Sequence, residues 1–198
     1  MLDLSKILNF VGLLNTFRQV ERVVLANNEK RWENDVEHSY HLAMLAWYIG
    51  ESHALPLNRD LLVKYALVHD LVEVYAGDTY IYTMNQSEKD SKKAREEKAA
   101  VELRENFPEF EALHRLIFAY EKREGAESRF VYALDKIQPI LNIYTDGGRT
   151  WKEKGVTIQM LVDTKKHQVA LSPEVSACFE ELVRLLKKDE EKLFTVAI

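Results

Sequence analysis

The chain has 198 residues, a length typical of a single domain. Hydrophobic residues make up 46% of it and charged residues 30%, the composition of a globular protein able to bury a core. Its 27 lysines and arginines against 32 aspartates and glutamates give a net charge of −5, which argues against binding to a nucleic-acid polymer.

Apolar residues recur at helical spacing in the first half of the chain. The first stripe spans residues 4–14, and the second spans residues 42–49. Asn58 has the character of an N-cap for a third helix, which carries apolar residues from 61 to 72 and stops before Gly77. This pattern predicts three helices before residue 77.

The second half continues in the same way. Residues 89–106 mix both charge signs around a few apolar positions, and shorter apolar stripes follow at 113–120 and 130–144. The run Ser172-Pro173-Glu174, a hydroxyl N-cap followed by proline, predicts the start of a final helix through Leu186.

Strand patterns are nearly absent. Residues 80–82 and 156–158 alternate but are too short to build a sheet, and Asp146-Gly147-Gly148-Arg149 is typical of a turn. An all-α domain of about seven or eight helices is the consistent interpretation.

The cysteine content and the apolar segments bear on the compartment. A single cysteine, Cys178, cannot form an intramolecular disulfide. The apolar run at the N-terminus is interrupted by Lys6 and Asn9, unlike a secretory signal, and no segment approaches the roughly 18 uninterrupted apolar residues of a membrane span. We therefore expect a cytoplasmic protein with no membrane partner.

Several polar residues interrupt the predicted helices. His38 lies near the start of the second helix, His69 and Asp70 are adjacent in the third, and Glu73 follows His69 by one turn. Asp135 lies inside the apolar stripe of 130–144, where a core-facing helix normally presents an apolar side chain. Taken singly, each has an ordinary structural explanation.

Taken together, four of these residues form a set of metal-binding groups. They supply two imidazoles and two carboxylates from three helices: His38, His69, Asp70 and Asp135. Such a set suits a divalent ion, whose identity among Mn, Co, Mg, Fe, Ni and Zn stays open, whereas the single cysteine excludes a thiolate-rich structural zinc site. With six-fold coordination, two positions would remain for water or substrate, as in a catalytic site.

The order of these residues resembles the H…HD…D signature of the HD-domain metal-dependent phosphohydrolases. Glu37-His38-Ser39, then His69-Asp70-x-x-Glu73-Val74-x-x-Gly77-Asp78, then Leu134-Asp135-Lys136 are similar to the branch of YfbR-like 5′-nucleotidases. The dipeptide alone is common, but the extended string is specific.

The resemblance implies a helical fold and extends over most of the chain. Its core motifs fall within residues 8–144, so that residues 145–198 are interpreted as a C-terminal helical extension. We accordingly expect a single HD domain over residues 1–198.

The resemblance also implies roles for individual residues. Two histidines and two aspartates match the metal ligands of the family: His38, His69, Asp70 and Asp135. Glu73 matches the acid that orients or deprotonates the attacking water, and Asp78 matches an aspartate near the sugar and the reacting centre. Thr79 could donate to a phosphate or sugar oxygen.

Two arginines upstream of His38 are candidates for binding the phosphate. Arg22 best matches the phosphate-binding arginine of the family, and Arg31 is a second candidate. Where deoxynucleotidase-type members have a tryptophan after this arginine, Val23 follows Arg22 here, so that either Trp32 or no residue takes the stacking role. The sugar preference therefore stays open.

The leading hypothesis is metal-dependent release of phosphate from nucleoside 5′-monophosphates by an activated water. The first alternative is an HD-type hydrolase that acts on a phosphodiester, a nucleoside triphosphate or another phosphorylated metabolite. The second is a non-catalytic nucleotide-sensing module. Because members of the resembled family are commonly dimers, we also expect a homodimer.

Overall fold

The computed structural model describes residues 1–77 and 86–194, with the backbone alone for 86–90. Within these ranges the predicted all-α character is confirmed, since eight helices have ten or more residues. The helices are α1 (Leu4–Phe17), α2 (Asp35–Ser52), α3 (Arg59–Val68), α4 (Glu73–Ala76), α5 (Gln86–Asn106), α6 (Glu111–Glu121), α7 (Gly125–Thr145), α8 (Arg149–Lys154), α9 (Ile158–Val169), α10 (Pro173–Lys188) and α11 (Glu190–Leu193).

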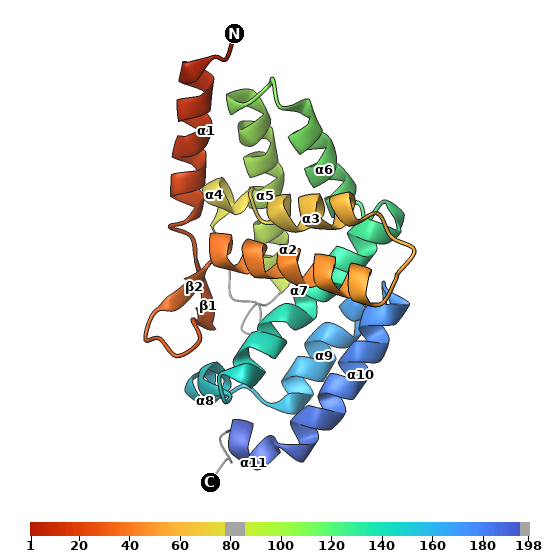
Figure 1. Ribbon diagram of the computed structural model, residues 1–198. Coiled ribbons are helices and arrows are strands. Elements are labelled where there is room, and N and C mark those ends of the chain that lie inside the picture. Colours follow the sequence, from red (N-terminus) through yellow and green to blue (C-terminus); the bar gives the residue numbers. More distant parts are fainter. Residues whose placement is uncertain (78–85, 195–198) are drawn as a thin grey trace.

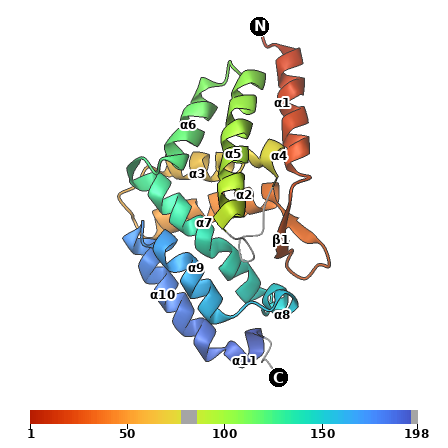
Figure 2. The same cartoon turned by 180° about the vertical axis from the view of Figure 1, so that it is seen from behind.

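The helices form two groups that meet at α2 and α3. In Figure 1, α1, α5 and α6 lie above these two helices, and α7, α9 and α10 lie below and behind them; Figure 2 shows the same grouping from the other side. Each group has its own cluster of buried apolar side chains. Ala66 belongs to the lower cluster and Leu71 to the upper one, so His69 and Asp70 lie where the chain passes from one core to the other.

The predicted caps are confirmed, but the third helix is shorter than predicted. The Asn58 side chain accepts from the Leu61 backbone N–H (3.1 Å), and Ser172 caps α10 in the same way. The prediction of one helix through residue 72 is wrong, because α3 ends at Val68. Backbone hydrogen bonds between residues i and i+3 then form a tight turn before α4 begins; in one of them, Glu73 N donates to Asp70 O at 2.8 Å.

A two-stranded hairpin was missed by the sequence analysis. Strand β1 (Glu21–Leu25) pairs antiparallel with β2 (Trp32–Asn34). The loop between the strands turns at Asn28, which adopts a left-handed φ of 60°. Arg149 donates to two carbonyls of this loop, at Ala26 (2.9 Å) and Glu29 (2.7 Å), and so joins the hairpin to the turn after α7.

The apolar stripe of α1 is exposed rather than buried. Leu13 and Phe17 face the upper core, whereas the stripe itself stays 42–66% exposed; its members are Leu4, Ile7, Leu8, Val11 and Leu14. None of the helices in the described residues is long and apolar enough to cross a bilayer.

The turn between α7 and α8 provides a stability test with a built-in control. Gly147 and Gly148 both have a left-handed φ, of 67° and 76°. A Cβ on Gly148 would collide with the backbone carbonyl of Leu193, whereas a Cβ on Gly147 would meet nothing within 4 Å.

Both alanine variants therefore carry the conformational cost of about 1–2 kcal/mol, and only Gly148→Ala adds an overpacking cost of about 1–3 kcal/mol. Urea denaturation of the two variants measures the difference. Equal unfolding free energies for the two would show that the turn does not pack on α11.

Candidate metal centre

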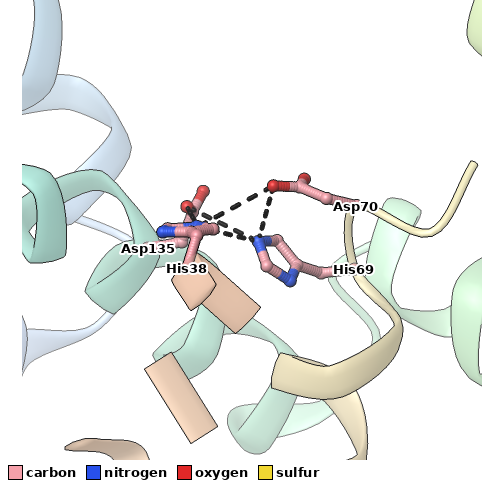
Figure 3. A group of neighbouring side chains, drawn as sticks. All are labelled: His38, His69, Asp70 and Asp135. Atoms are coloured by element: carbon pink, nitrogen blue, oxygen red, sulfur yellow. Dashed lines mark hydrogen bonds and ion pairs between the residues drawn. The ribbon is translucent and has the colours of Figure 1, made fainter. Parts of the chain in front are cut away.

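Two histidines and two aspartates converge at the end of α3. Figure 3 shows His38 from α2, His69 and Asp70 from the segment after α3, and Asp135 from α7 pointing at one another. The His38 Nε2 atom lies 3.2 Å from His69 Nε2 and 3.0 Å from Asp135 Oδ1, and His69 Nε2 lies 3.0 Å from Asp70 Oδ2. The structure thus brings together the four residues that the sequence grouped.

Local structure determines how each side chain reaches this point. Asn34 and Glu37 form a capping box that starts α2, which places His38 in its first turn. His69 is the C-cap of α3, and the tight turn that follows directs Asp70 to the same place. Asp135 is buried on the core-facing side of α7, at 4% exposure.

The second ring nitrogen of each histidine has its own partner. The Nδ1 atom of His38 lies 2.9 Å from Gln138 Oε1, and the Nδ1 atom of His69 lies 2.8 Å from the Ala66 carbonyl. Because both partners are acceptors, each Nδ1 donates. When the rings are deprotonated at Nε2, the Nε2 lone pair of each is therefore directed at the cluster, the orientation that metal-ligating histidines show.

The electrostatics of the cluster favour a cation. Burial, followed by the nearby Arg22 guanidinium, lowers the pKa of His38 to about 4, so this ring is neutral at pH 7. Burial alone would also lower the pKa of His69, but the Asp70 and Asp135 carboxylates outweigh it and raise that pKa to about 10. The same carboxylates attract a metal ion to this position.

The two carboxyl groups are ionised despite their surroundings. Burial disfavours the charged form of Asp70, yet His69 and Arg22 depress its pKa well below the ordinary value. Burial acts in the same direction on Asp135, and the Lys136 ammonium is the main group that depresses its pKa. Both aspartates are therefore ready to act as anionic ligands.

This donor set fits a divalent metal ion. The four ligand atoms lie within 4.8 Å of one another. Nitrogen and oxygen ligands about 2.0–2.2 Å from one ion would lie about 3 Å or more apart, which is the spacing seen here. An ion that displaces the Nε2 proton of His69 leaves two neutral imidazoles and two carboxylates, which balance a charge of +2, so the cluster can hold such an ion.

A second group of acids shares Asp70 with the cluster. Carboxylate oxygens of Asp35, Asp70 and Glu73 lie within 4.8 Å of one another. Arg22 Nη1 donates to Asp35 (2.9 Å) and to Asp70 (2.8 Å), and Lys92 Nζ lies 3.4 Å from Glu73. Glu73 is only 4% exposed, so a buried acid lies beside the Asp70 ligand.

The remaining predicted residues divide into three cases. Arg22 from β1 is at the cluster. Arg31 instead pairs with Glu29 and Glu37, and its side chain is 45% exposed. Asp78 and Thr79 lie outside the described residues.

Three buried residues at the site were missed by the sequence analysis. Gln138 lies one turn after Asp135 in the same apolar stripe, the signal that drew attention to Asp135 itself. Asp35 and Glu33 flank the start of α2, and Glu33 Oε1 lies 3.6 Å from His38 Nδ1. No periodic pattern distinguishes those two acids in the sequence.

The chain is similar in sequence to proteins with an HD domain. A family model described as an HD domain matches residues 14–176. The human protein 5′-deoxynucleotidase HDDC2 is 33% identical over 138 residues, which are 68% of this chain and 65% of that protein. The zebrafish (Danio rerio) 5′-deoxynucleotidase HDDC2 is 27% identical over 144 residues, 71% of this chain and 70% of that protein.

Solved structures have the same fold. A predicted metal-dependent phosphohydrolase from Magnetospirillum magnetotacticum MS-1 superposes with a TM-score of 0.79 and 31% identity, over 97% of this chain and 98% of that one. An HD-domain phosphohydrolase from Listeria innocua has a TM-score of 0.57 at 18% identity, over 92% of this chain and 86% of that one, and supports the fold alone.

The contact between Gln138 and His38 is open to a direct test. Gln138→Leu removes the acceptor for His38 Nδ1, so the ring no longer has a fixed tautomer. We expect the affinity for Mn²⁺ to fall by about 10–100-fold, as for other partners of metal-binding histidines. Competition with a fluorescent chelator measures this affinity.

The matched control is Gln138→Glu, which keeps an acceptor at the same place and should bind Mn²⁺ within about threefold of wild type. Unchanged affinity in Gln138→Leu, with a native circular dichroism spectrum, would contradict the assigned contact.

Proposed function

The chain belongs to the HD domain family, and from that premise we propose that it is a metal-dependent phosphohydrolase that releases phosphate from nucleoside 5′-monophosphates. The observation that carries the proposal is the pair of side-chain groups that share Asp70. One group can hold the ion, and the other supplies a buried acid, Glu73, beside it.

In this proposal the residues divide the work of hydrolysis. His38, His69, Asp70 and Asp135 would hold the ion, which when bound polarises a phosphoryl oxygen and lowers the pKa of a neighbouring water. Glu73 accepts the proton of the attacking water, as a positioned carboxylate does in general base catalysis.

Arg22 has the position that suits phosphate better than Arg31. Its guanidinium bridges Asp35 and Asp70 at the cluster, so it orients the Asp70 ligand and adds positive charge where the phosphoryl group would lie. Arg31 belongs to an exposed ion-pair group instead. Asp78 and Thr79 keep their proposed roles near the sugar and the phosphate.

The names of the similar human and zebrafish proteins support a proposal for the substrate class. The human and zebrafish proteins are named 5′-deoxynucleotidases, and the chain spans 65% of the human protein's length. We propose deoxynucleoside monophosphates as the first substrates to test. The net charge of −5 supports a small partner rather than a nucleic-acid polymer, and the single cysteine suits the cytoplasm.

We further propose a homodimer that forms through α1. The exposed stripe of this helix is an apolar surface of the kind that marks interfaces between protein chains. In a two-fold dimer the same stripe of each copy would pack against the other.

Glu73→Gln tests the catalytic proposal. The amide has the shape of the acid but cannot take a proton, so we expect kcat to fall by about 10²–10⁴-fold. Phosphate release from a panel of ribo- and deoxynucleoside monophosphates, with Mn²⁺, Co²⁺ or Mg²⁺, measures it.

Two further variants serve as the negative and the positive control. Asp70→Ala should lose both the metal and the activity, whereas Glu102→Gln, an exposed acid on α5, should keep wild-type rates. An absence of phosphate release by wild type in all three metals would overturn the proposed function. Pyrophosphate or triphosphate as product would favour another HD-type hydrolase, and tight nucleotide binding without turnover would favour a sensor.

Introducing charged residues into the apolar stripe of α1 tests the proposed dimer interface. Leu8→Glu combined with Val11→Glu should convert a dimer into a monomer, because burying two unpaired carboxylates per chain is unfavourable. Light scattering after size exclusion reports the mass. Asn9→Glu, an exposed position on the same helix, is the control, and a wild-type monomer would contradict the dimer.

A further inference from the structure

The two oxygen atoms of the Asp135 carboxylate have different partners. Oδ1 faces the metal cluster (Figure 3), 3.0 Å from His38 Nε2 and 3.6 Å from His69 Nε2. Oδ2 accepts a hydrogen bond from Nζ of Lys136, the next residue on α7. Asp135 is 4% exposed, so this oxygen is paired with an ammonium group where water has little access. Of the two oxygens, Oδ1 is therefore the one directed at the ion site.

The other aspartate of the cluster is paired differently. Asp70 Oδ2 lies 3.0 Å from His69 Nε2 and also accepts from Arg22 Nη1 at 2.8 Å. Arg22 thus contacts the same oxygen that faces the cluster, whereas Lys136 contacts the Asp135 oxygen that does not. An ion in the cluster would share the Asp70 oxygen with Arg22, but it would leave the contact between Lys136 and Asp135 in place.

An aromatic ring on the same helix helps to hold the Lys136 ammonium group in place. Tyr132 lies one turn before Lys136 on α7, and Lys136 Nζ is 4.8 Å from the centre of its ring. Tyr132 has two further contacts: the guanidinium carbon of Arg123 lies 4.0 Å from the ring centre, and the hydroxyl accepts from Gln168 Nε2 at 3.3 Å. The ring and the carboxylate together therefore fix the ammonium group beside Asp135 Oδ2.

The pairing of Oδ2 limits the way in which Asp135 can bind an ion. Carboxylates bind divalent ions through one oxygen or through both. An oxygen that already accepts from an ammonium group is a poor second ligand, because the ion and the ammonium group repel each other at that distance. A ligand atom that the protein withholds leaves one more coordination position for a water molecule or a substrate oxygen.

We propose that Lys136 is a positioning residue that restricts Asp135 to one ligand oxygen and so keeps a coordination position open for the attacking water or a phosphoryl oxygen. This role rests on the proposed function and deepens it, because it explains how a residue that is not a ligand controls the open side of the metal. It also sets affinity against reactivity: a second Asp135 oxygen would hold the ion more tightly while it occupied the position that the reaction needs.

Lys136→Met tests this role, because it removes the ammonium group and keeps an unbranched side chain beside the Tyr132 ring. We expect the number of water molecules bound to Mn²⁺ to fall by about one, since Asp135 then supplies both oxygens. Water-proton relaxation of the Mn²⁺-loaded protein measures this number without any turnover. The affinity for Mn²⁺, measured by competition with a chelator, should rise by at least about threefold, because a repelling charge is lost and a ligand atom is gained.

Two variants serve as controls. Lys136→Arg retains a cation beside Asp135 and should keep the number of bound water molecules found in wild type. Lys64→Met removes an exposed lysine on α3 and should change neither this number nor the affinity. If Lys136→Met fails to fold, Lys136→Leu replaces it. A folded, uncharged variant with as many bound water molecules as wild type, or with weaker Mn²⁺ binding, would overturn the proposed role, since the loss of a merely structural contact loosens the site.

Turnover separates the role of Lys136 from the proposed function. Where wild type hydrolyses nucleoside monophosphates, Lys136→Met should lower kcat by about 10–100-fold although it binds the metal more tightly. If the number of bound water molecules depends on Lys136 but no substrate is hydrolysed, the proposed function fails while the role of Lys136 stands. If wild type binds no Mn²⁺, both fail.

Discussion

The structure depends on one electrostatic constraint, which is that two carboxylates and two imidazoles meet in a largely buried cluster. Groups of this kind are costly to remove from water unless each is paired or coordinated. Compensation is visible at every member: Arg22 on Asp70, Lys136 on Asp135, and an acceptor on the Nδ1 atom of each histidine. A divalent ion completes this compensation, so the arrangement is most favourable when metal is bound.

Several elements of the fold each bring one residue to this cluster. The hairpin supplies Arg22, the capping box at its exit starts α2 at His38, and α7 passes behind α2 and α3 to supply Asp135. The His69-Asp70 pair lies between Ala66, which packs in one apolar core, and Leu71, which packs in the other, so both cores help to position these two ligands.

The sequence predicted the residues whose chemistry conflicts with their local pattern. Asp135 was recognisable because an acid stands in an apolar stripe, and Gln138 carries the same signal without a motif to draw attention to it. Periodicity could not locate the break after Val68, because Leu71 and Val72 continue the apolar pattern while packing in the other core. It also could not separate Arg22 from Arg31, since the difference lies in their partners, nor show that the α1 stripe is exposed.

Anomalous diffraction from crystals grown with Mn²⁺ tests the central claim most directly. We expect one manganese peak within about 2.0–2.3 Å of His38 Nε2, His69 Nε2 and one oxygen each of Asp70 and Asp135. A peak held by Asp35 and Glu73 alone, or no peak at this cluster, would contradict it.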